Sequence, residues 1–214
     1  MKNFYALAIF LIALSINAQE NIKYQKPSKE ILDLVEYERP PSVQYDEDKN
    51  YMVFLYRDNY KSIADLSEKE LRLGGLRINP KTNIGSRVTF YNNVKIKKLK
   101  DKNGPVNQVS GLPENPKLTN FTWSPDETKI ALTNTTEKGV ELWVLDLETA
   151  SVLKLTDAIL NANIGGVINW QPDSQSMLVK TLSQNRKPLI DTSSIVPDGP
   201  TISNNYGAKA QNRT

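Results

Sequence analysis

Phe121-Thr-Trp-Ser-Pro-Asp-Glu-Thr-Lys-Ile-Ala-Leu132 occurs a second time in this chain, as Ile168-Asn-Trp-Gln-Pro-Asp-Ser-Gln-Ser-Met-Leu-Val179. In both copies a strand ends at a tryptophan, whose large apolar ring can pack between sheets. A proline then fixes one φ angle of a turn, and an aspartate accepts backbone hydrogen bonds as the chain reverses. The residues that match are Trp123 and Trp170, Pro125 and Pro172, and Asp126 and Asp173. The sequence therefore predicts an internal repeat of one antiparallel strand–turn–strand unit.

The residues after the first copy supply the rest of the repeating unit. Its return strand is expected over 129–133, and 141–147 should form a third strand that is apolar on both faces and so covered on both sides. A fourth strand is expected over 151–155. Four short strands that recur about every 40–50 residues are typical of the blades of a β-propeller. A β-sandwich is the alternative, which the matched turns disfavour.

A degenerate earlier copy, which lacks the proline, extends from Tyr45-Asp46 to Tyr51-Met-Val-Phe54. We therefore expect an all-β fold in which residues 42–214 form an incomplete β-propeller. It would hold about the first two to three four-stranded blades, with starts near residues 42, 119 and 166. Propellers have about four to eight blades, and Gly207–Thr214 supply no closing strand. We therefore expect the sequence to be cut short.

Residues 1–18 predict a secretory signal peptide. Lys2 gives a short positive start, residues 4–16 are predominantly apolar, and Ala18 suits a cleavage site. The apolar stretch is short for a membrane span. We therefore expect a secreted or periplasmic protein without stable membrane insertion after signal cleavage. An uncleaved N-terminal membrane anchor is the alternative.

Residues 19–41 are expected to form an N-terminal extension with one short helix. The apolar spacing predicts the helix over 29–36, and Ser28 is a suitable N-cap. Pro40-Pro41 should end it, because proline cannot donate a backbone hydrogen bond and restricts the residue before it.

The segment between the first and second copies predicts further elements. Ser67 and Glu70 match a capping box, which predicts the start of a short helix. Strands are expected over 87–91 and 94–99. The five lysines between Lys95 and Lys102 could form a polyanion-binding strip, but lysines of this kind are more typical of a solvated strand edge.

The composition excludes several functions. The 214 residues include neither cysteine nor histidine, so disulfides, thiol nucleophiles, a Ser-His-Asp triad and the usual transition-metal sites are excluded within this chain. Lys plus Arg is 27 and Asp plus Glu is 24, which is too balanced to indicate a nucleic-acid partner. Asp126 and Asp173 could be imagined as calcium ligands, but the turns account for them. We therefore expect no catalytic residue, metal or cofactor here.

The repeat resembles the β-propeller units of TolB-like proteins and of the prolyl oligopeptidase family (S9) of serine peptidases. Further stretches are similar to the glutamyl endopeptidase branch of that family, and the resemblance covers roughly residues 26–214. These stretches are Leu71-Arg-Leu-Gly-Gly-Leu-Arg-Ile-Asn-Pro80, Asn83, Ser86-Arg87, Phe90-Tyr91, Pro188-Leu-Ile-Asp191, Val196-Pro-Asp-Gly-Pro200 and Arg213-Thr214.

The resemblance implies an exported serine endopeptidase or oligopeptidase, glutamyl-preferring, in which a propeller covers and gates a C-terminal α/β-hydrolase domain. The implied partners of this chain are that hydrolase domain of the parent chain and peptide substrates. Neither a Gly-x-Ser-x-Gly motif nor a triad occurs here, so the fragment itself should not be catalytic. Arg77 and Arg87 are the candidates for binding substrate carboxylates. The alternative is a stand-alone periplasmic TolB-like binding or adaptor module.

Overall fold

The computed structural model describes residues 25–101 and 103–187 and divides the chain into two units, Met1–Glu38 and Arg39–Thr214. The expected signal peptide over 1–18 and the resemblance stretches after residue 187 lie outside the described residues. In the first unit, helix α2 (Lys29–Val35) confirms the predicted short helix. The Ser28 carbonyl accepts hydrogen bonds from the first turn, although its hydroxyl makes no capping bond.

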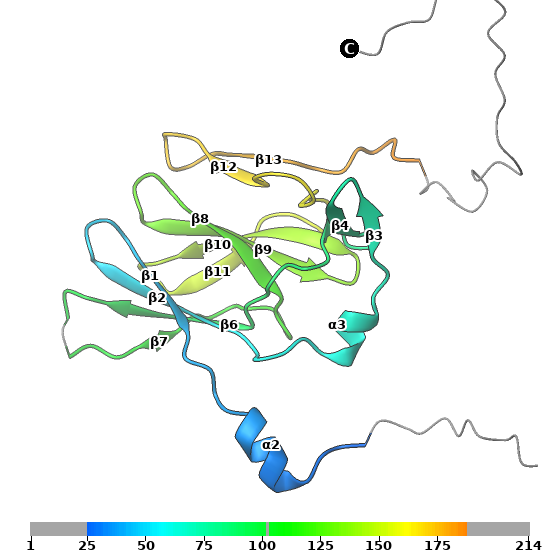
Figure 1. Ribbon diagram of the computed structural model, residues 1–214. Helices are drawn as coiled ribbons and strands as arrows, with labels where there is room; N and C mark the ends of the chain where they lie inside the picture. Colours follow the sequence, from blue (N-terminus) through cyan, green and yellow to red (C-terminus); the bar gives the residue numbers. More distant parts are fainter. Residues whose placement is uncertain (1–24, 102, 188–214) are drawn as a thin grey trace, which may run out of the picture. The chain divides into compact units, whose positions relative to one another are not determined.

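The second unit is built from antiparallel β-sheets (Figure 1). Sheet 1 has the order β1-β2-β6-β7, sheet 2 has the order β11-β10-β9-β8, and β12 pairs with β13. A small sheet β3-β4-β5 and helix α3 (Ile63–Ser67) lie between β2 and β6 in sequence. The strands are β1 (Ser42–Tyr45), β2 (Tyr51–Tyr56), β3 (Leu71–Leu73), β4 (Leu76–Asn79), β5 (Ile84–Gly85), β6 (Asn93–Lys98), β7 (Asn107–Gln108), β8 (Leu118–Trp123), β9 (Lys129–Thr136), β10 (Gly139–Asp146), β11 (Ser151–Lys154), β12 (Ile168–Trp170) and β13 (Met177–Val179).

Sheet 2 separates two hydrophobic cores, because its central strands are apolar on both faces. One face carries Ile130, Leu132 and Leu145, which pack against Val53 and other residues of sheet 1. The opposite face carries a second set, which packs with β12 and with the segments on either side of it. This second set includes Ala131, Val140, Leu142, Leu160, Val167 and Ile168. The prediction of a strand covered on both sides over 141–147 is thus confirmed by β10.

The three repeat turns share one backbone geometry, including the degenerate first copy. Lys49, Glu127 and Ser174 have positive φ angles of 56°, 54° and 55°. Their amides donate to the carbonyls three residues earlier, at 3.1, 2.9 and 3.1 Å. The first turn keeps this geometry without a proline, because the Asp46 carboxylate accepts from the amides of Asn50 and Tyr51 at 2.8 and 2.6 Å.

Each repeat is also hydrogen-bonded to the one before it. The Trp123 indole donates to Gln44 Oε1 of β1 at 3.3 Å, and the Trp170 indole donates to the Thr122 carbonyl of β8 at 2.9 Å. The turns are linked in the same direction, since the Glu127 carboxylate accepts from the Glu47 amide at 2.9 and 3.0 Å. In the next turn, the Ser174 hydroxyl accepts from the Asp126 amide at 3.0 Å. The first strands β1, β8 and β12 therefore follow one another in space.

Two local predictions were wrong. Ser67 does not start a helix but ends one: α3 begins after Ser62, whose hydroxyl accepts from the Asp65 amide while the Asp65 carboxylate accepts from the Ser62 amide. Asp at the third helical position closes the capping box as well as Glu does, because both present a carboxylate. Residues 87–91 form no strand, and only Tyr91 pairs, with Leu118.

Candidate functional site

Residues 57–92 form an insertion between β2 and β6 that gathers at one end of the sheets. The same end holds the β9–β10 turn, as the Lys81–Glu137 ion pair at 3.8 Å shows. The Ala162 amide donates to the Asn83 carbonyl at 2.9 Å, which brings the segment after β11 to this end as well. The three repeat turns lie at the opposite end (Figure 1). Both arginine candidates, Arg77 and Arg87, belong to this insertion.

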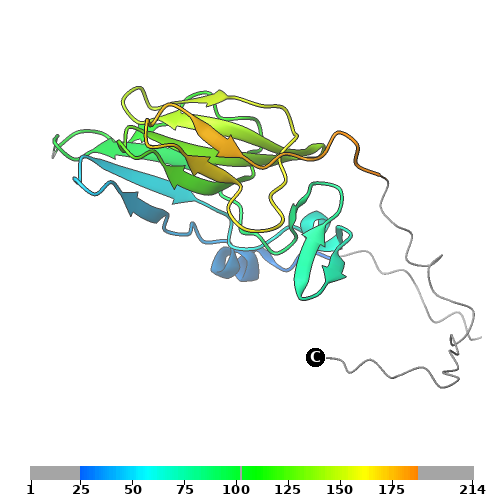
Figure 2. The ribbon, with the colours of Figure 1, turned by 90° about the horizontal axis from the view of Figure 1, so that it is seen from above.

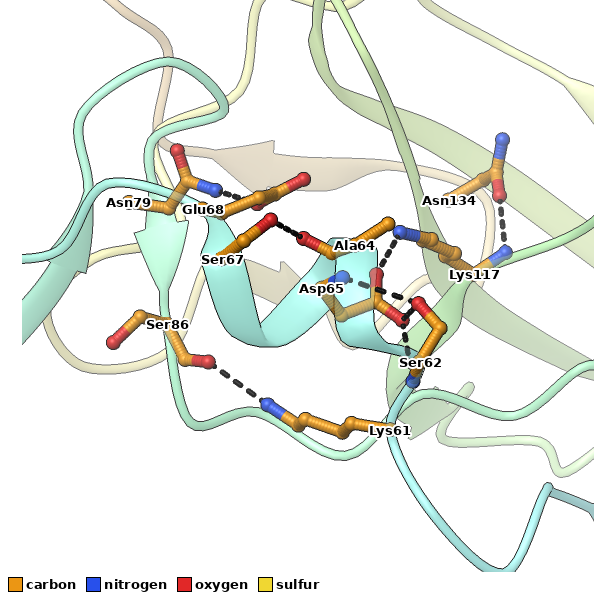
Figure 3. Close-up of polar contacts among 10 residues, drawn as sticks. All are labelled: Lys61, Ser62, Ala64, Asp65, Ser67, Glu68, Asn79, Ser86, Lys117 and Asn134. Carbon is orange, nitrogen blue, oxygen red and sulfur yellow. Dashed lines mark hydrogen bonds and ion pairs between the residues drawn. The ribbon is translucent and has the colours of Figure 1, made fainter. Parts of the chain in front are cut away.

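Helix α3 fixes the insertion to sheet 2 (Figure 3). Asp65 forms a 2.6 Å ion pair with Lys117, and the Lys117 amide donates to Asn134 Oδ1 of β9 at 3.0 Å. The Lys117 ammonium, and after it the Ser62 hydroxyl, lowers the pKa of the Asp65 carboxyl below its ordinary value. Asp65 therefore serves both as a cap of its own helix and as the link to the sheet.

We predict that Ser62→Ala weakens α3, whereas Ser67→Ala does not. Loss of an N-cap hydroxyl costs about 1 kcal/mol, so amide protection in the helix should fall about fivefold. Ser67 donates only to the Ala64 carbonyl at the helix end. Hydrogen exchange of residues 63–67 measures the difference. Equal effects of the two substitutions would contradict the assignment of Ser62 as the cap.

The hairpin of β3 and β4 turns on a glycine pair and is held by one carboxylate. Gly74 and Gly75 have φ angles of 52° and 88°, which a two-residue hairpin turn of type I′ requires and glycine adopts without strain. Glu70 accepts hydrogen bonds from Arg77 at 2.6 Å, from Arg72 at 3.1 Å and from the Ser86 hydroxyl. The Ser86 hydroxyl first, and then the Arg77 guanidinium, lowers the pKa of Glu70 from 4.5 to about 2.

The low pKa of Glu70 predicts that the insertion loosens in acid. Its folded pKa lies below the ordinary value, so its stabilising contribution is complete above pH 4.5 and is lost as the pH falls through about 2. Amide exchange of β3 and β4 should accelerate over this range relative to β9. In Glu70→Gln the same amides should already exchange faster at pH 7 and change less with pH. An unchanged pH profile in that variant would contradict the prediction.

The structure places the two arginine candidates in different settings. Arg77 is partly buried, with 31% of its side chain exposed, and its guanidinium is committed to Glu70. Arg87 is exposed, and its side chain has no partner among residues 25–101 and 103–187. The Lys61 ammonium donates to the backbone carbonyl of Ser86, the residue before Arg87, at 2.9 Å (Figure 3). Arg87 is thus the candidate whose five N–H donors can reach a carboxylate from outside.

The repeat aspartates bond within their own turns. Asp126 Oδ1 accepts from the Ser124 hydroxyl at 2.6 Å, and Asp173 accepts from the Ser176 hydroxyl at 2.6 Å and the amides of Gln175 and Ser176. These hydrogen bonds lower the pKa of both carboxyls, and the serine hydroxyl makes the largest contribution in each case. Within the described ranges, no group of three or more acidic side chains is placed to hold a metal ion.

No helix of the described part is long and apolar enough to cross a membrane.

Sheet 2 contains a buried polar network that was not predicted from the sequence. Glu141, only 8% exposed, accepts from Lys154 Nζ at 2.6 Å, from the Trp143 indole at 2.9 Å and from Asn134 Nδ2 at 3.1 Å. Burial raises the pKa of Glu141, but these three donors outweigh it and the net shift is downward. An acidic residue inside an apolar strand was the available signal. Through Asn134 the network joins the Lys117 contact that holds α3.

Comparison with known proteins finds relatives over most of the chain. Two of them are plant proteins, each named "Probable glutamyl endopeptidase, chloroplastic". The one from Oryza sativa subsp. japonica is 32% identical over 193 residues, which is 85% of this chain and 20% of that protein. The one from Arabidopsis thaliana is 31% identical over 207 residues, which is 89% of this chain and 21% of that protein. No family model matches.

The chain thus spans about a fifth of the length of the curated relatives it matches. The similarity supports a peptidase-related family, and the structure is mostly β-sheet.

Proposed function

We propose that this chain is the N-terminal β-propeller part of an exported serine endopeptidase or oligopeptidase of the prolyl oligopeptidase family, with a preference for glutamyl residues. The observation that carries the proposal is the similarity to proteins named glutamyl endopeptidase, which extends over 85% and 89% of the chain. In this proposal the signal peptide directs the protein to the periplasm or outside the cell. The blades start near residues 42, 119 and 166.

The arrangement of the sheets supports the propeller. Sheets 1 and 2 are four-stranded antiparallel sheets, and the β12–β13 pair follows as the start of a third. The hydrogen bonds of Trp123 and Trp170 to the preceding first strand repeat from one sheet to the next. A constant relation between successive sheets is what a propeller requires, since its blades are arranged around one central axis.

The role of this part is to cover and gate a C-terminal α/β-hydrolase domain and to help bind the peptide. The insertion offers an exposed guanidinium at Arg87, held beside a hairpin that Glu70 and Arg77 fix. Arginine binds carboxylates through two parallel N–H···O bonds. Arg87 therefore contacts the glutamate side chain of the substrate and contributes to its selection, while the hydrolase domain performs the chemistry.

The test is made in the parent protein, with the residues that follow Thr214 included. Hydrolysis of Glu-containing peptides that a serine-directed fluorophosphonate abolishes would support the peptidase class. Absence of hydrolysis, together with cooperative folding of residues 19–214 alone, would favour the TolB-like adaptor instead.

Arg87→Ala tests the role in substrate selection. A hydrogen bond to a charged group is worth about 1.5–3 kcal/mol, so kcat/KM on Glu-containing peptides should fall at least about tenfold. For peptides with Gln in place of Glu, kcat/KM should fall less. Lys138→Ala, which removes an exposed positive charge from the β9–β10 turn at the same end, is the matched control and should change little. An unchanged kcat/KM for Arg87→Ala would exclude this role.

A further inference from the structure

Helix α3 presents its apolar side chains to solvent rather than to the sheets. Ile63 and Leu66 are 57% and 71% exposed, and Tyr60, just before the helix, is 68% exposed. Of the helix residues, all of which the structure describes, only Asp65 is not exposed, and it binds Lys117 (Figure 3). A surface helix ordinarily does the reverse and turns its apolar side inward.

The outward side of α3 forms a small apolar surface. Ile63 and Leu66 are three residues apart, so they lie on the same face of the helix. We call these two residues, together with Tyr60, the α3 surface. Figures 1 and 2 show the insertion that carries it at one end of the sheets. Apolar side chains grouped on a surface mark a place where a ligand or partner binds.

The charges around the α3 surface favour an acidic occupant. The carboxylates nearest to it in sequence, Asp65, Glu68 and Glu70, all accept hydrogen bonds from other side chains of the unit. The exposed Lys61 ammonium donates to a backbone carbonyl, so this bond leaves its charge unneutralised. Arg87 is exposed and has no partner among residues 25–101 and 103–187. The positive charges are therefore available to a ligand, whereas the negative charges are engaged.

Arg87 belongs to a segment that passes beside α3. At the start of this segment, Lys61 Nζ, next to the helix, donates to the carbonyl of residue 86 at 2.9 Å. At its end, Lys117 Nζ lies 5.9 Å from the centre of the Phe90 ring and forms the 2.6 Å ion pair with Asp65 of the helix. Both ends of the segment 86–90 are thus fixed next to α3, which places Arg87 close to the α3 surface.

We propose that the α3 surface is a subsite for an apolar side chain of a peptide whose glutamate binds Arg87. The proposal rests on the proposed function, because it places the apolar subsite beside the glutamate that Arg87 selects. Free cations attract the acidic group, and the α3 surface removes the apolar side chain from water. In an extended peptide, side chains two residues apart point to the same side. The apolar residue therefore lies two positions from the glutamate.

Hydrolysis of paired peptides by the parent protein tests the subsite. Each internally quenched peptide contains one glutamate and either leucine or serine two residues before or after it. At one of these positions leucine should raise kcat/KM about tenfold over serine, mainly through KM, because binding removes its side chain from water. In Ile63→Ser and Leu66→Ser this preference should fall to about twofold or less. Leu66→Met, which keeps the apolar volume, should retain it.

Val106→Ser is the matched control for Ile63→Ser. Val106 is also β-branched and is 45% exposed, but it lies between β6 and β7, beyond the end of β6 that is far from the insertion. Its substitution should leave the preference for leucine unchanged. All the substituted side chains are exposed, so each variant should keep its fold, which urea unfolding checks.

The outcomes separate the subsite from the proposed function. Hydrolysis without a preference for leucine, or a preference that survives both serine substitutions, would overturn the subsite and leave the peptidase class standing. If no fluorophosphonate-sensitive hydrolysis occurs, the proposed function fails, and binding of the same peptides with a fluorescein label decides on the subsite. Leucine peptides should then bind the parent about tenfold more tightly than serine peptides, and Leu66→Ser should abolish the difference.

Equal binding of the two labelled peptides would overturn the subsite. Vesicles of phosphatidylglycerol test a membrane as the occupant instead. Binding to these vesicles that Leu66→Ser abolishes, without any preference among the peptides, would also overturn the proposal and assign the α3 surface to an anionic lipid surface.

Discussion

Leu145→Ala is expected to lower the free energy of unfolding by about 2–5 kcal/mol, the range for removal of a large side chain from a packed core. Leu145 is 0% exposed and lies in β10, which is hydrogen-bonded on both sides, to β9 and β11. Its side chain fills the core between sheets 1 and 2, with Leu132 and Leu147 as members of the same cluster. Neither sheet can collapse into the gap without breaking its strand register.

Urea unfolding followed by tryptophan fluorescence measures this loss, with circular dichroism as a second probe of two-state behaviour. Leu66→Ala is the matched control, because the same atoms are removed from a side chain that is 71% exposed. The control should change the free energy by no more than about 0.5 kcal/mol. A loss below about 1 kcal/mol for Leu145→Ala would be incompatible with a packed core between the two sheets.

Glu141→Ala is expected to cost about 2–4 kcal/mol, because it removes the common acceptor of three donors. The Trp143 indole and the Asn134 amide would be left without this partner, and Asn134 is only 4% exposed. An unsatisfied buried donor costs about 1–3 kcal/mol. The Lys154 ammonium, 39% exposed, can turn to water and adds less.

Glu141→Gln separates the charge from the hydrogen bonds. The amide keeps one acceptor oxygen for the buried donors but turns an NH₂ group toward the remaining ones, so we expect a smaller loss than with alanine. Urea unfolding gives the loss of unfolding free energy for both variants. If alanine and glutamine had the same effect, or if neither destabilised the protein, the network would not hold sheet 2 as described.

Local patterns in the sequence were sufficient to predict the repeat and its strands. The Trp-x-Pro-Asp turns determine where β8 ends and β9 begins, and where β12 ends and β13 begins, since proline and aspartate act within a few residues. Apolar residues on both faces of 141–147 predicted burial on both sides, which the two cores confirm. The degenerate first copy was recognised without its proline and has the same turn geometry.

The insertion was harder to predict because its contacts are distant in sequence. Two serines are followed three residues later by an acidic residue, Ser62 by Asp65 and Ser67 by Glu70, and local pattern does not decide between them. The decision comes from the Asp65 contact with Lys117 and from the recruitment of Glu70 by Arg77 and Ser86. These are tertiary contacts, which a capping pattern does not encode.

The candidate site likewise depends on tertiary contacts that a local sequence pattern does not encode. The sequence singled out Arg77 and Arg87 equally, since both stand in the same family-like stretch. Only the fold distinguishes them, because Glu70 engages Arg77 and the described residues leave the Arg87 side chain exposed without a partner. Which arginine is available to bind a carboxylate depends on the position of Glu70, and the spacing of residues in the sequence does not give that position.

The two ends of the sheets differ in how freely they can change in evolution. At one end, a turn of fixed geometry is bonded to the turn before it, so a change of length there would disturb its neighbour as well. At the other end, only Glu137 and Lys138 join β9 to β10, whereas residues 57–92 join β2 to β6 in an equivalent place. The same scaffold accepts either connection. New recognition elements can therefore be acquired at this end by insertion, while the repeating framework that carries them stays constant.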